Sequence, residues 1–233
     1  MVESSATVSA QYYPQIFDVS DIARAKEIIL TDEGPGAETQ TRWDVETPYL
    51  MELLQQTLNL SSHSVVLDYG CGIGRMAKAM IDACGCSVIG VDISPNMRAL
   101  AGDYVGSDRF FAVSPGQFDM MVAAGLRVSA VISIWVLQHS FAPADDIERI
   151  RRSLASDGKG FILNMSKRAI PAVMSTEESD AKFAWVSDAT DVAELLISAF
   201  DIVSQGIPDA SRTPNMADAG AYWMSFRQFS GKS

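Results

Sequence analysis

The chain has 233 residues, and its 48% hydrophobic content is typical of one α/β domain with a sizeable core, or of such a domain with a small cap. Its formal net charge of -11 disfavours phosphate backbones and anionic lipid as partners, so we expect neither nucleic acid nor a membrane. No apolar run approaches membrane-spanning length, and residues 1–10 lack the apolar core of a signal peptide. With only three cysteines, these features favour a cytoplasmic location.

The first sixty residues predict an N-terminal helical lid. Apolar side chains recur at helical spacing over Pro14–Leu30, which favours a first helix. The stretch Thr31–Gln40 is rich in Gly, Pro and acidic residues and predicts a loop. Thr47 followed by Pro48 resembles an N-cap and a first helical position, so we expect the next helix to begin there.

From residue 61 onward the chain alternates between apolar strands and helices. The predicted strands are Ser64–Asp68, Ser87–Asp92, Arg109–Val113, Ser129–Val136 and Gly160–Met165. The predicted helices between and after them are Gly74–Cys84, Pro95–Tyr104, Pro143–Leu154 and Asp191–Phe200. Apolar strands separated by helices indicate a parallel sheet covered on both faces, that is, a Rossmann-like doubly wound α/β fold.

The final third of this core predicts two departures from the alternation. Ser166–Val186 has no clear period and reads as an irregular insertion. The last two apolar runs, Phe200–Gln205 and Ala221–Phe229, are separated by a loop without helical period, so we expect them to pair antiparallel at one end of the sheet. Residues 61–233 are therefore predicted to form the core domain, with an insertion at about 166–186.

The strongest motif is the glycine-rich turn after the first core strand. Gly70, Gly72 and Gly74 follow a strand that ends in Asp68, and such a turn allows a ligand to approach the main chain. The dinucleotide pattern G-x-G-x-x-G fails here because Arg75 takes the last glycine position, and no P-loop G-K-[ST] follows. The sequence therefore favours a ligand with little or no phosphate.

A second carboxylate specifies the ligand further. Asp92 ends the second core strand, where an acidic side chain can accept hydrogen bonds from ribose hydroxyls. An adenosine-like ligand without a full phosphate-binding apparatus is expected. Cys84-Gly-Cys86 has one intervening residue and no nearby histidine, so no metal site is expected.

Four stretches in order make the chain similar to class I S-adenosylmethionine-dependent methyltransferases. They are "VLDYGCGIGR", "VIGVDISPNM", "AVISIWVLQHS" and "LASDGKGFILN", and they cover Val65–Asn164. The small-molecule subgroup called methyltransferase type 11 is the most similar. The resemblance implies a seven-stranded, mostly parallel sheet with an antiparallel last strand, and S-adenosylmethionine as the cofactor.

The resemblance also implies cofactor-binding residues. Asp68 would favour the positive charge of the amino-acid tail, Arg42 or Arg75 its carboxylate, and the Ile134 backbone its amino group. Asp92 would bind the ribose, and Ile93 and Met97 would sandwich the adenine. Ser114 would meet the adenine edge, although the family often has an acidic residue there. Gly70, Gly72 and Gly74 complete the set.

Candidate acceptor residues follow the same strand ends. His139, just past the fourth core strand, is a candidate general base, and a capping or cofactor-side role fits its position equally well. Tyr12, Tyr13 and Trp43 fit an aromatic lid or the core, and Trp135 is a further aromatic candidate. Arg168 would bind an acidic acceptor, but exposure without function is the favoured reading.

The expected function is methyl transfer to an oxygen or nitrogen of a small organic acceptor, by a monomer or homodimer. Three alternatives stay open from the sequence. They are methylation of a protein side chain, a nicotinamide-nucleotide oxidoreductase, and a binding protein that has kept the fold without turnover. The glycine spacing argues against the nicotinamide cofactor.

Overall fold

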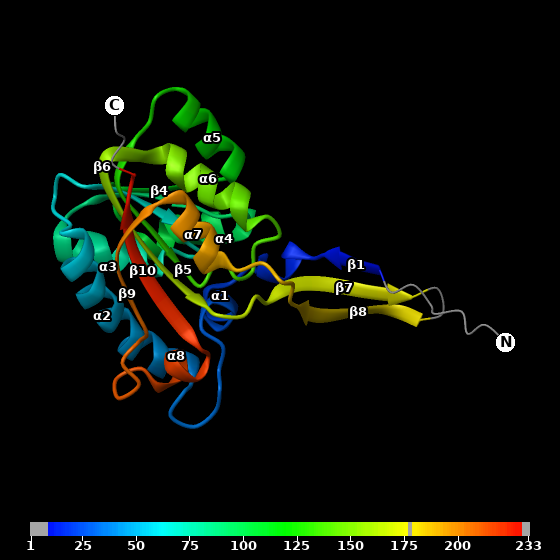
Figure 1. The fold of residues 1–233 in the computed structure, drawn as a ribbon. Coiled ribbons are helices and arrows are strands. Elements are labelled where there is room, and N and C mark those ends of the chain that lie inside the picture. Colours follow the sequence, from blue (N-terminus) through cyan, green and yellow to red (C-terminus); the bar gives the residue numbers. More distant parts are fainter. Residues whose placement is uncertain (1–8, 177–178, 230–233) are drawn as a thin grey trace.

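The computed structural model describes residues 9–176 and 179–229, so the polar first eight residues lie outside it, as do the ends of the predicted lid and core ranges. Two sheets form in this part of the chain. A seven-stranded sheet makes the body of the protein, and a three-stranded sheet extends away from it as an arm (Figure 1). No helix in the described ranges is long and apolar enough to cross a membrane.

The seven-stranded sheet has the order β4-β3-β2-β5-β6-β10-β9. Its strands are β2 (Val65–Tyr69), β3 (Ser87–Val91), β4 (Phe110–Val113), β5 (Val128–Ile134), β6 (Leu154–Met165), β9 (Asp201–Gly206) and β10 (Ala221–Arg227). The first five are paired parallel, while β10 pairs antiparallel with both β6 and β9. The predicted α/β class and the antiparallel pairing of the last two runs are confirmed.

Helices cover both faces of this sheet, as the two-sided apolar strands require. One core cluster lies under α2 (Thr39–Leu58), α3 (Arg75–Cys84), α4 (Pro95–Val105) and α8 (Pro214–Asp218). The second lies under α5 (Pro115–Ala123), α6 (Pro143–Ser153) and α7 (Val192–Ala199). Neighbouring strand residues alternate between the clusters, so that Val131 belongs to one and Ile132 to the other.

The predicted start of a helix at Thr47 and Pro48 is wrong, because α2 begins two turns earlier at Thr39 and contains Pro48 in its interior. The proline lacks the N–H that would bond to the carbonyl of Asp44. Asp44 is exposed, so water can satisfy this carbonyl. Thr47 uses its hydroxyl to donate a hydrogen bond to the Trp43 carbonyl, at 2.5 Å. The proline is therefore tolerated as a local defect.

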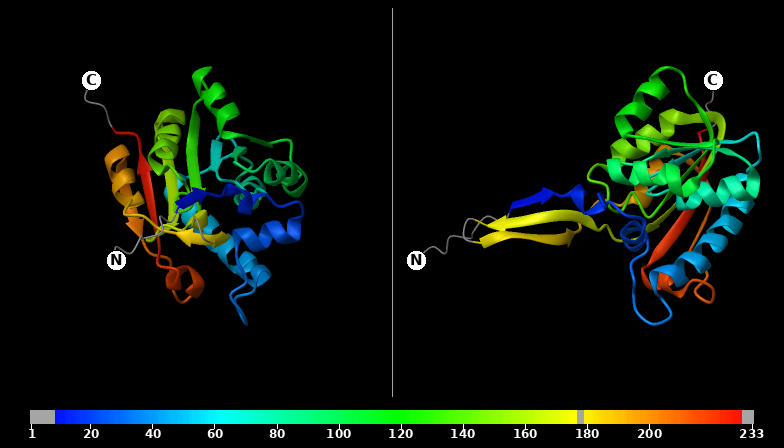
Figure 2. Two further views of the ribbon diagram at one scale, coloured as in Figure 1. Left: turned by 90° about the vertical axis from the view of Figure 1, so that its right-hand side faces the viewer. Right: turned by 180° about the vertical axis from the view of Figure 1, so that it is seen from behind.

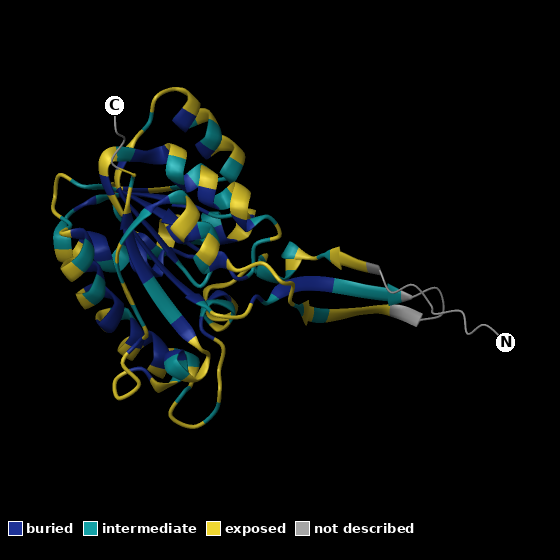
Figure 3. Ribbon diagram, in the orientation of Figure 1, coloured by how far each residue is buried: buried dark blue, intermediate teal, exposed yellow. Residues whose placement is uncertain are grey.

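The predicted irregular segment at 166–186 is also corrected, since most of it is a β-hairpin. Strand β7 (Ile170–Thr176) pairs antiparallel with β8 (Ser179–Val186) on one side and with β1 (Ser9–Tyr12) on the other. These three strands are the arm, which projects well beyond the body (Figures 1 and 2). The central strand is more buried than its two neighbours (Figure 3). Part of the expected helical lid is thus a strand.

A strap connects the arm to α2 across the edge of the body. It contains the short helix η1 (Pro14–Phe17) and the helix α1 (Ile22–Ile29), so the single predicted helix is interrupted. Ala25 and Leu30 of the strap pack with Ile73 and Met97 of the body. Asp18, in the interruption, accepts a 2.6 Å hydrogen bond from the Ser94 hydroxyl at the start of α4.

Candidate active site

A cavity opens at the carboxyl ends of the parallel strands, where ligands bind in sheets of this type. It contains about 1100 Å³ of empty space, part of it in the open mouth. The body contributes the turns after β2, β3 and β5, and the strap contributes further apolar walls. Ten predicted site residues line the cavity: Asp68, Gly70, Gly72, Arg75, Asp92, Ile93, Met97, Ile134, Trp135 and His139.

The glycine turn lines the cavity, and it is closely packed where side chains would project. Gly70 has φ +78° and Gly72 has φ +54°, both in the left-handed region that favours glycine. A Cβ on Gly70 would lie 2.2 Å from a methyl of Val136, and one on Gly72 would lie 2.8 Å from Ile29 of the strap. Gly74 caps α3 and does not line the cavity. The turn therefore has room for main chain only.

Asp92 holds this turn together. One carboxylate oxygen accepts a hydrogen bond from the Gly72 N–H at 2.8 Å, and the other accepts one from the Ser94 N–H at 2.9 Å. Burial raises the pKa of Asp92, and these two N–H groups lower it again. Each carboxylate oxygen has a second lone pair, so the side chain can still accept hydrogen bonds from a ligand. Its structural role was not visible in the sequence.

Three buried polar atoms, each on a residue that lines the cavity, have no hydrogen-bond partner among the described residues. They are Oδ2 of Asp68, Nη1 of Arg75 and Nε1 of Trp135. Burial raises the pKa of Asp68 to about 7, although Arg75 opposes the shift. Burial lowers the pKa of Arg75 to about 10. One acceptor and two donors without partners form a set that suits a ligand with both an ammonium and a carboxylate group.

Trp135 has an unusual backbone conformation at the end of β5. Its φ is +63°, which is rare and costly for a bulky residue. Its N–H donates a 2.9 Å hydrogen bond to the Leu163 carbonyl, so the turn is fixed to the neighbouring strand. The strained turn leads the chain directly into the segment that carries His139.

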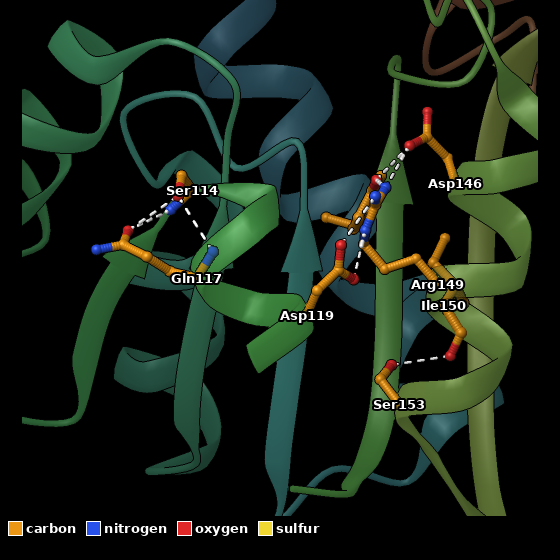
Figure 4. Close-up of polar contacts among 8 residues, drawn as sticks. Ser114, Gln117, Asp119, Asp146, Arg149, Ile150 and Ser153 are labelled. Carbon is orange, nitrogen blue, oxygen red and sulfur yellow. Dashed lines mark hydrogen bonds and ion pairs between the residues drawn. The ribbon is translucent and has the colours of Figure 1, made fainter. Parts of the chain in front are cut away.

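The predicted adenine contacts divide into two groups. Ile93 is exposed and Met97 is buried, and both line the cavity. Ser114 does not line it, since its hydroxyl caps α5 by accepting a hydrogen bond from the Gln117 N–H (Figure 4). The Ser114 N–H in turn donates to the Gln117 side chain at 2.9 Å. Pro115, the next residue, does line the cavity.

Three other predicted residues lie outside the cavity lining. Arg42 is buried and pairs with Glu46 and Glu33, at 2.8 Å each. Trp43 is buried in the core, where its ring lies 5.4 Å from the Arg75 guanidinium. Tyr13 lies on the arm and is more than one-third exposed. Of the two candidate arginines for a tail carboxylate, only Arg75 lines the cavity.

His139 lies at the inner end of the arm. Its Nδ1 is 2.6 Å from the Ala169 carbonyl, which can only accept, so Nδ1 carries the proton. Nε2 then carries the lone pair, which accepts a 3.3 Å hydrogen bond from the Gln138 side-chain amide in the ligand-free protein, so an acceptor would take the place of this donor. Burial lowers the pKa of His139, and the Ala169 contact opposes this in part. The imidazole is therefore neutral at pH 7 and has the form of a base.

Arg168 is buried, which corrects the favoured expectation that it is exposed. It pairs with Asp188 at 3.1 Å and donates a hydrogen bond to the Ser140 carbonyl. It does not line the cavity. Its contacts join the segment after β6 to the segment after β5, so they hold the His139 region against the root of the arm.

An acidic network lies beside the same segment. Asp146 accepts hydrogen bonds from the Tyr69 hydroxyl and the Ser140 hydroxyl, at 2.5 Å each, and from Arg149 at 2.8 Å. Arg149 also pairs with Asp119 of α5 at 2.8 Å (Figure 4). Burial and the Asp146 charge raise the pKa of Tyr69. Tyr69, Ser140 and Asp146 all line the cavity.

Sequence reasoning missed these three residues as candidates for the site. Phe17, Ile28 and Ile29 of the strap also line the cavity, although their apolar spacing predicted only a helix. Tyr12 of β1, a candidate for the aromatic lid, lines the cavity as well. Burial, Asp146 and Asp92 raise the pKa of Tyr12. No local signal identifies Asp146, because an acidic residue in a first helical turn is ordinary. Within residues 9–176 and 179–229 no cluster of His, Cys, Asp and Glu could hold a metal ion.

Comparison with known proteins agrees with this geometry. Residues 67–162 match the family described as a methyltransferase domain. Similar solved structures include the DhpI–SAH complex, with 18% identity and a TM-score of 0.58 over 90% of this chain and 93% of that one. A TehB-like SAM-dependent methyltransferase from Corynebacterium glutamicum has 16% identity and a TM-score of 0.54, over 78% and 86%.

A third similar structure carries a different activity in its name. The [4+2]-cyclase SpnF has 18% identity and a TM-score of 0.61, over 85% of this chain and 86% of that one. Identities at this level establish the fold alone. The comparison with curated protein sequences found no significant match.

Proposed function

We propose that this chain, a class I S-adenosylmethionine-dependent methyltransferase, transfers the methyl group to a hydroxyl oxygen or an amine nitrogen of a small organic acceptor. The main support for the proposal is the state and the position of the His139 side chain. Its imidazole is neutral, its Nδ1–H is held by the Ala169 carbonyl, and it lines the cavity. A hydroxyl or protonated amine has to lose a proton when it is methylated, and a neutral imidazole can accept one.

The cavity residues fit the cofactor. Asp68 is suited to its ammonium group, and Arg75 and Trp135 to its carboxylate, because these three side chains have atoms without partners in the described chain. Asp92 is suited to the ribose, and Ile93 and Met97 offer apolar surface to the adenine. S-adenosylmethionine, when bound, supplies an activated methyl group on a positively charged sulfur. The work left to the protein is to align the acceptor and to exclude water.

The residues around His139 set the conditions for proton removal. Phe17 of the strap and Trp185 of β8 pack against the imidazole in tilted arrangements, with ring centroids 5.6 and 5.3 Å away. These rings limit the access of water and keep the base in its neutral form. The Ala169 hydrogen bond fixes which nitrogen accepts the proton. The arm therefore acts on the reaction through the orientation of His139.

The charges in the cavity argue against a carboxylate as the acceptor. Arg168, the candidate partner for an acidic acceptor, is engaged by Asp188 and by the Ser140 carbonyl. Among the described residues that line the cavity, Arg75 is the one lysine or arginine. Asp146 adds negative charge near His139's segment. A neutral or cationic acceptor is favoured on these grounds.

The division into an N-terminal covering region and a methyltransferase core supports the same function. We propose that the region 1–60 and the insertion at 166–186 form the acceptor side together with the segment of His139, while the rest of 61–233 binds the cofactor. Tyr12, Phe17 and Ile29 come from the first region, and Trp185 comes from the insertion. Acceptor specificity would then vary with these segments and not with the sheet.

The test is an acceptor screen. The purified protein is incubated with S-adenosylmethionine and separate panels of phenols, alcohols, primary and secondary amines, and carboxylic acids. Mass spectrometry detects products heavier by one methyl in place of hydrogen, and S-adenosylhomocysteine release is measured in parallel. Products only among hydroxyl or amine compounds support the proposal. Methyl esters of the acids as the sole products would contradict it. So would methylation found only on protein when a panel of purified proteins is added as a fifth set of acceptors.

A further inference from the structure

A continuous row of aromatic rings leads from His139 outward along the arm. The His139 and Trp185 ring centroids are 5.3 Å apart, Trp185 and Phe183 are 5.3 Å apart, and Phe183 and Tyr13 are 6.4 Å apart. Trp185, Phe183 and Tyr13 are 50%, 42% and 39% exposed. We call these three residues the aromatic track. It joins the proposed catalytic base to the solvent-exposed surface of the arm.

Strand geometry puts the track on one face of the arm. Phe183 and Trp185 are two residues apart on β8, so their side chains point to the same side. Opposite them on β7 stand Val173 and Pro171. Tyr13 continues from β1, and its N–H donates a 2.9 Å hydrogen bond to the Pro171 carbonyl. These five residues are all uncharged, so the face attracts neither anions nor cations by direct pairing.

The exposed aromatic track is expected to bind another molecule. A three-stranded sheet that projects from the body has little core of its own (Figure 2). Large aromatic side chains exposed next to one another on it are unfavourable in water and mark interaction sites. Lys182, the described lysine of β8, is opposite Met174 and belongs to the other face. Gln11, which is opposite Val173, belongs to the face of the track and is polar but uncharged, so the charge of Lys182 lies away from the track.

We propose that the acceptor carries an extended, uncharged apolar portion that lies along the aromatic track while its nucleophilic atom is next to His139. This inference rests on the proposed function, since it deepens the description of the same acceptor. Continuity supports a single ligand for both parts, because the track begins with a ring that touches His139. The lack of charge on the track sets the chemistry of the extended portion.

The test uses a homologous series of neutral phenols. The probes are the methyl, propyl, pentyl and heptyl esters of 4-hydroxybenzoic acid, titrated calorimetrically in the presence of saturating S-adenosylhomocysteine. In the wild type, the affinity should rise about two- to fourfold for each added methylene, as expected when methylenes leave water. In Phe183→Ala this dependence should fall to less than about 1.5-fold for each methylene, while Phe183→Leu should keep most of it.

A matched control is available elsewhere on the body. Phe111 on β4 is 48% exposed, close to the 42% of Phe183, and lies at the far edge of the large sheet from the arm. Phe111→Ala should therefore bind the whole ester series as the wild type does. Affinity for S-adenosylhomocysteine and the melting temperature should be unchanged in all three variants, since Phe183 lies outside the cavity lining.

The outcomes separate this inference from the proposed function. Chain-length-dependent binding that is lost in Phe183→Ala supports the track even if no phenol is methylated, and in that case the assignment of the acceptor group fails alone. Methylation without any dependence on chain length overturns the track and leaves the proposed function in place. A wild type that binds none of the esters also overturns it.

Analytical ultracentrifugation tests whether a second copy of this chain binds the track instead. If Phe183→Ala dissociates a dimer and leaves the ester series unaffected, the track is an interface between copies, and the inference is wrong.

Discussion

Replacement of His139 tests the proposed base directly. In the wild type the Ala169 carbonyl lies 2.6 Å from His139 Nδ1. His139→Gln removes the Nε2 lone pair but keeps an amide that can still donate a hydrogen bond towards this carbonyl. His139→Ala removes both functions and also the ring contacts with Phe17 and Trp185. The two variants together separate the loss of a base from the loss of packing.

Both substitutions should lower kcat far more than they change the affinity for S-adenosylhomocysteine. General-base catalysis contributes about 10²–10⁴-fold, so kcat should fall by this factor in both variants if the acceptor must lose a proton. The Ala169 carbonyl loses its donor only in His139→Ala, and because this hydrogen bond is partly buried the loss costs at most about 1–3 kcal/mol. The melting temperature should therefore fall further in the alanine variant. Affinity for S-adenosylhomocysteine should stay within about threefold in both, a factor of less than 1 kcal/mol.

The pH profile gives the sign of the effect. Burial lowers the pKa of His139 below its ordinary value, so the neutral base persists on the acid side of that value. Wild-type kcat should be flat between pH 7 and 9 and should fall only as the pH drops through the lowered pKa. The glutamine variant should lose this limb. Near-normal turnover of the true acceptor by His139→Gln between pH 6 and 9 would refute the role of His139 as a base.

Three further predictions concern the cofactor side. Asp92→Ala should weaken S-adenosylhomocysteine binding by about 1.5–3 kcal/mol, measured by calorimetry, and should also lower the melting temperature, because the N–H groups of Gly72 and Ser94 lose their acceptor. An unchanged affinity would remove Asp92 from the site. Gly72→Val should abolish stabilisation by S-adenosylhomocysteine in a thermal-shift assay, since a Cβ there would lie 2.8 Å from Ile29 at a φ of +54°. If S-adenosylhomocysteine raised the melting temperature of this variant as much as that of the wild type, the ligand would not lie close to the main chain at Gly72. Affinity for S-adenosylhomocysteine should increase from pH 5.5 to 7 and then level off, and Asp68→Asn should remove this dependence.

The parts of the fold that could be predicted are those with local signals. Buried parallel strands are apolar throughout, so Val65–Tyr69 and Val128–Ile134 stand out from the helices between them. The glycine turn and Asp92 follow from strand ends and the need for main-chain space. These signals identified the cavity wall on the cofactor side. A helix cap was equally readable at Ser94, whose hydroxyl accepts a hydrogen bond from the Met97 N–H at 3.0 Å.

The arm could not be predicted because its stability depends on distant pairing. Tyr12 is opposite Ala172, so β1 has a partner about 160 residues away in the chain. Pro171 argued further against a strand there, because proline cannot donate to a ladder. It is tolerated because it stands where β1 ends and only its carbonyl is used. The helix α5 was missed for a different, local reason, since its start, Pro115-Gly116, resembles a turn.

The candidate site was predicted only where residue type and position agree. Arg42 and Arg75 look alike in the sequence, and only packing decides between them, because Glu46 and Glu33 pair with the first. Arg168 was expected to be exposed because most arginines are. Its buried pairing with Asp188 depends on how the arm meets the body. The acceptor side is built from such long-range contacts, which is why its residues were the hardest to predict.

The pH dependence assigned to Asp68 follows from its burial. Desolvation raises its pKa to about 7 in the ligand-free protein, with Arg75 opposing and Asp92 adding to the shift. An ammonium group bound beside it would favour the ionised carboxylate, so binding below pH 7 releases a proton and affinity rises with pH by up to about tenfold per unit.

The same shift has a consequence for the ligand-free protein. The native state holds a proton on Asp68 between about pH 4 and pH 7 that the unfolded chain does not hold, so the contribution of this group to stability is complete below about pH 4 and is lost as the pH rises through 7. Saturating S-adenosylhomocysteine should therefore stabilise the protein more at pH 8 than at pH 5.5. Thermal unfolding of the wild type and of Asp68→Asn, with and without S-adenosylhomocysteine, measures how the stability of the free protein and the stabilisation by the ligand each change with pH. A ligand-induced shift that is larger at pH 5.5 than at pH 8 would show that Asp68 does not meet the ammonium group.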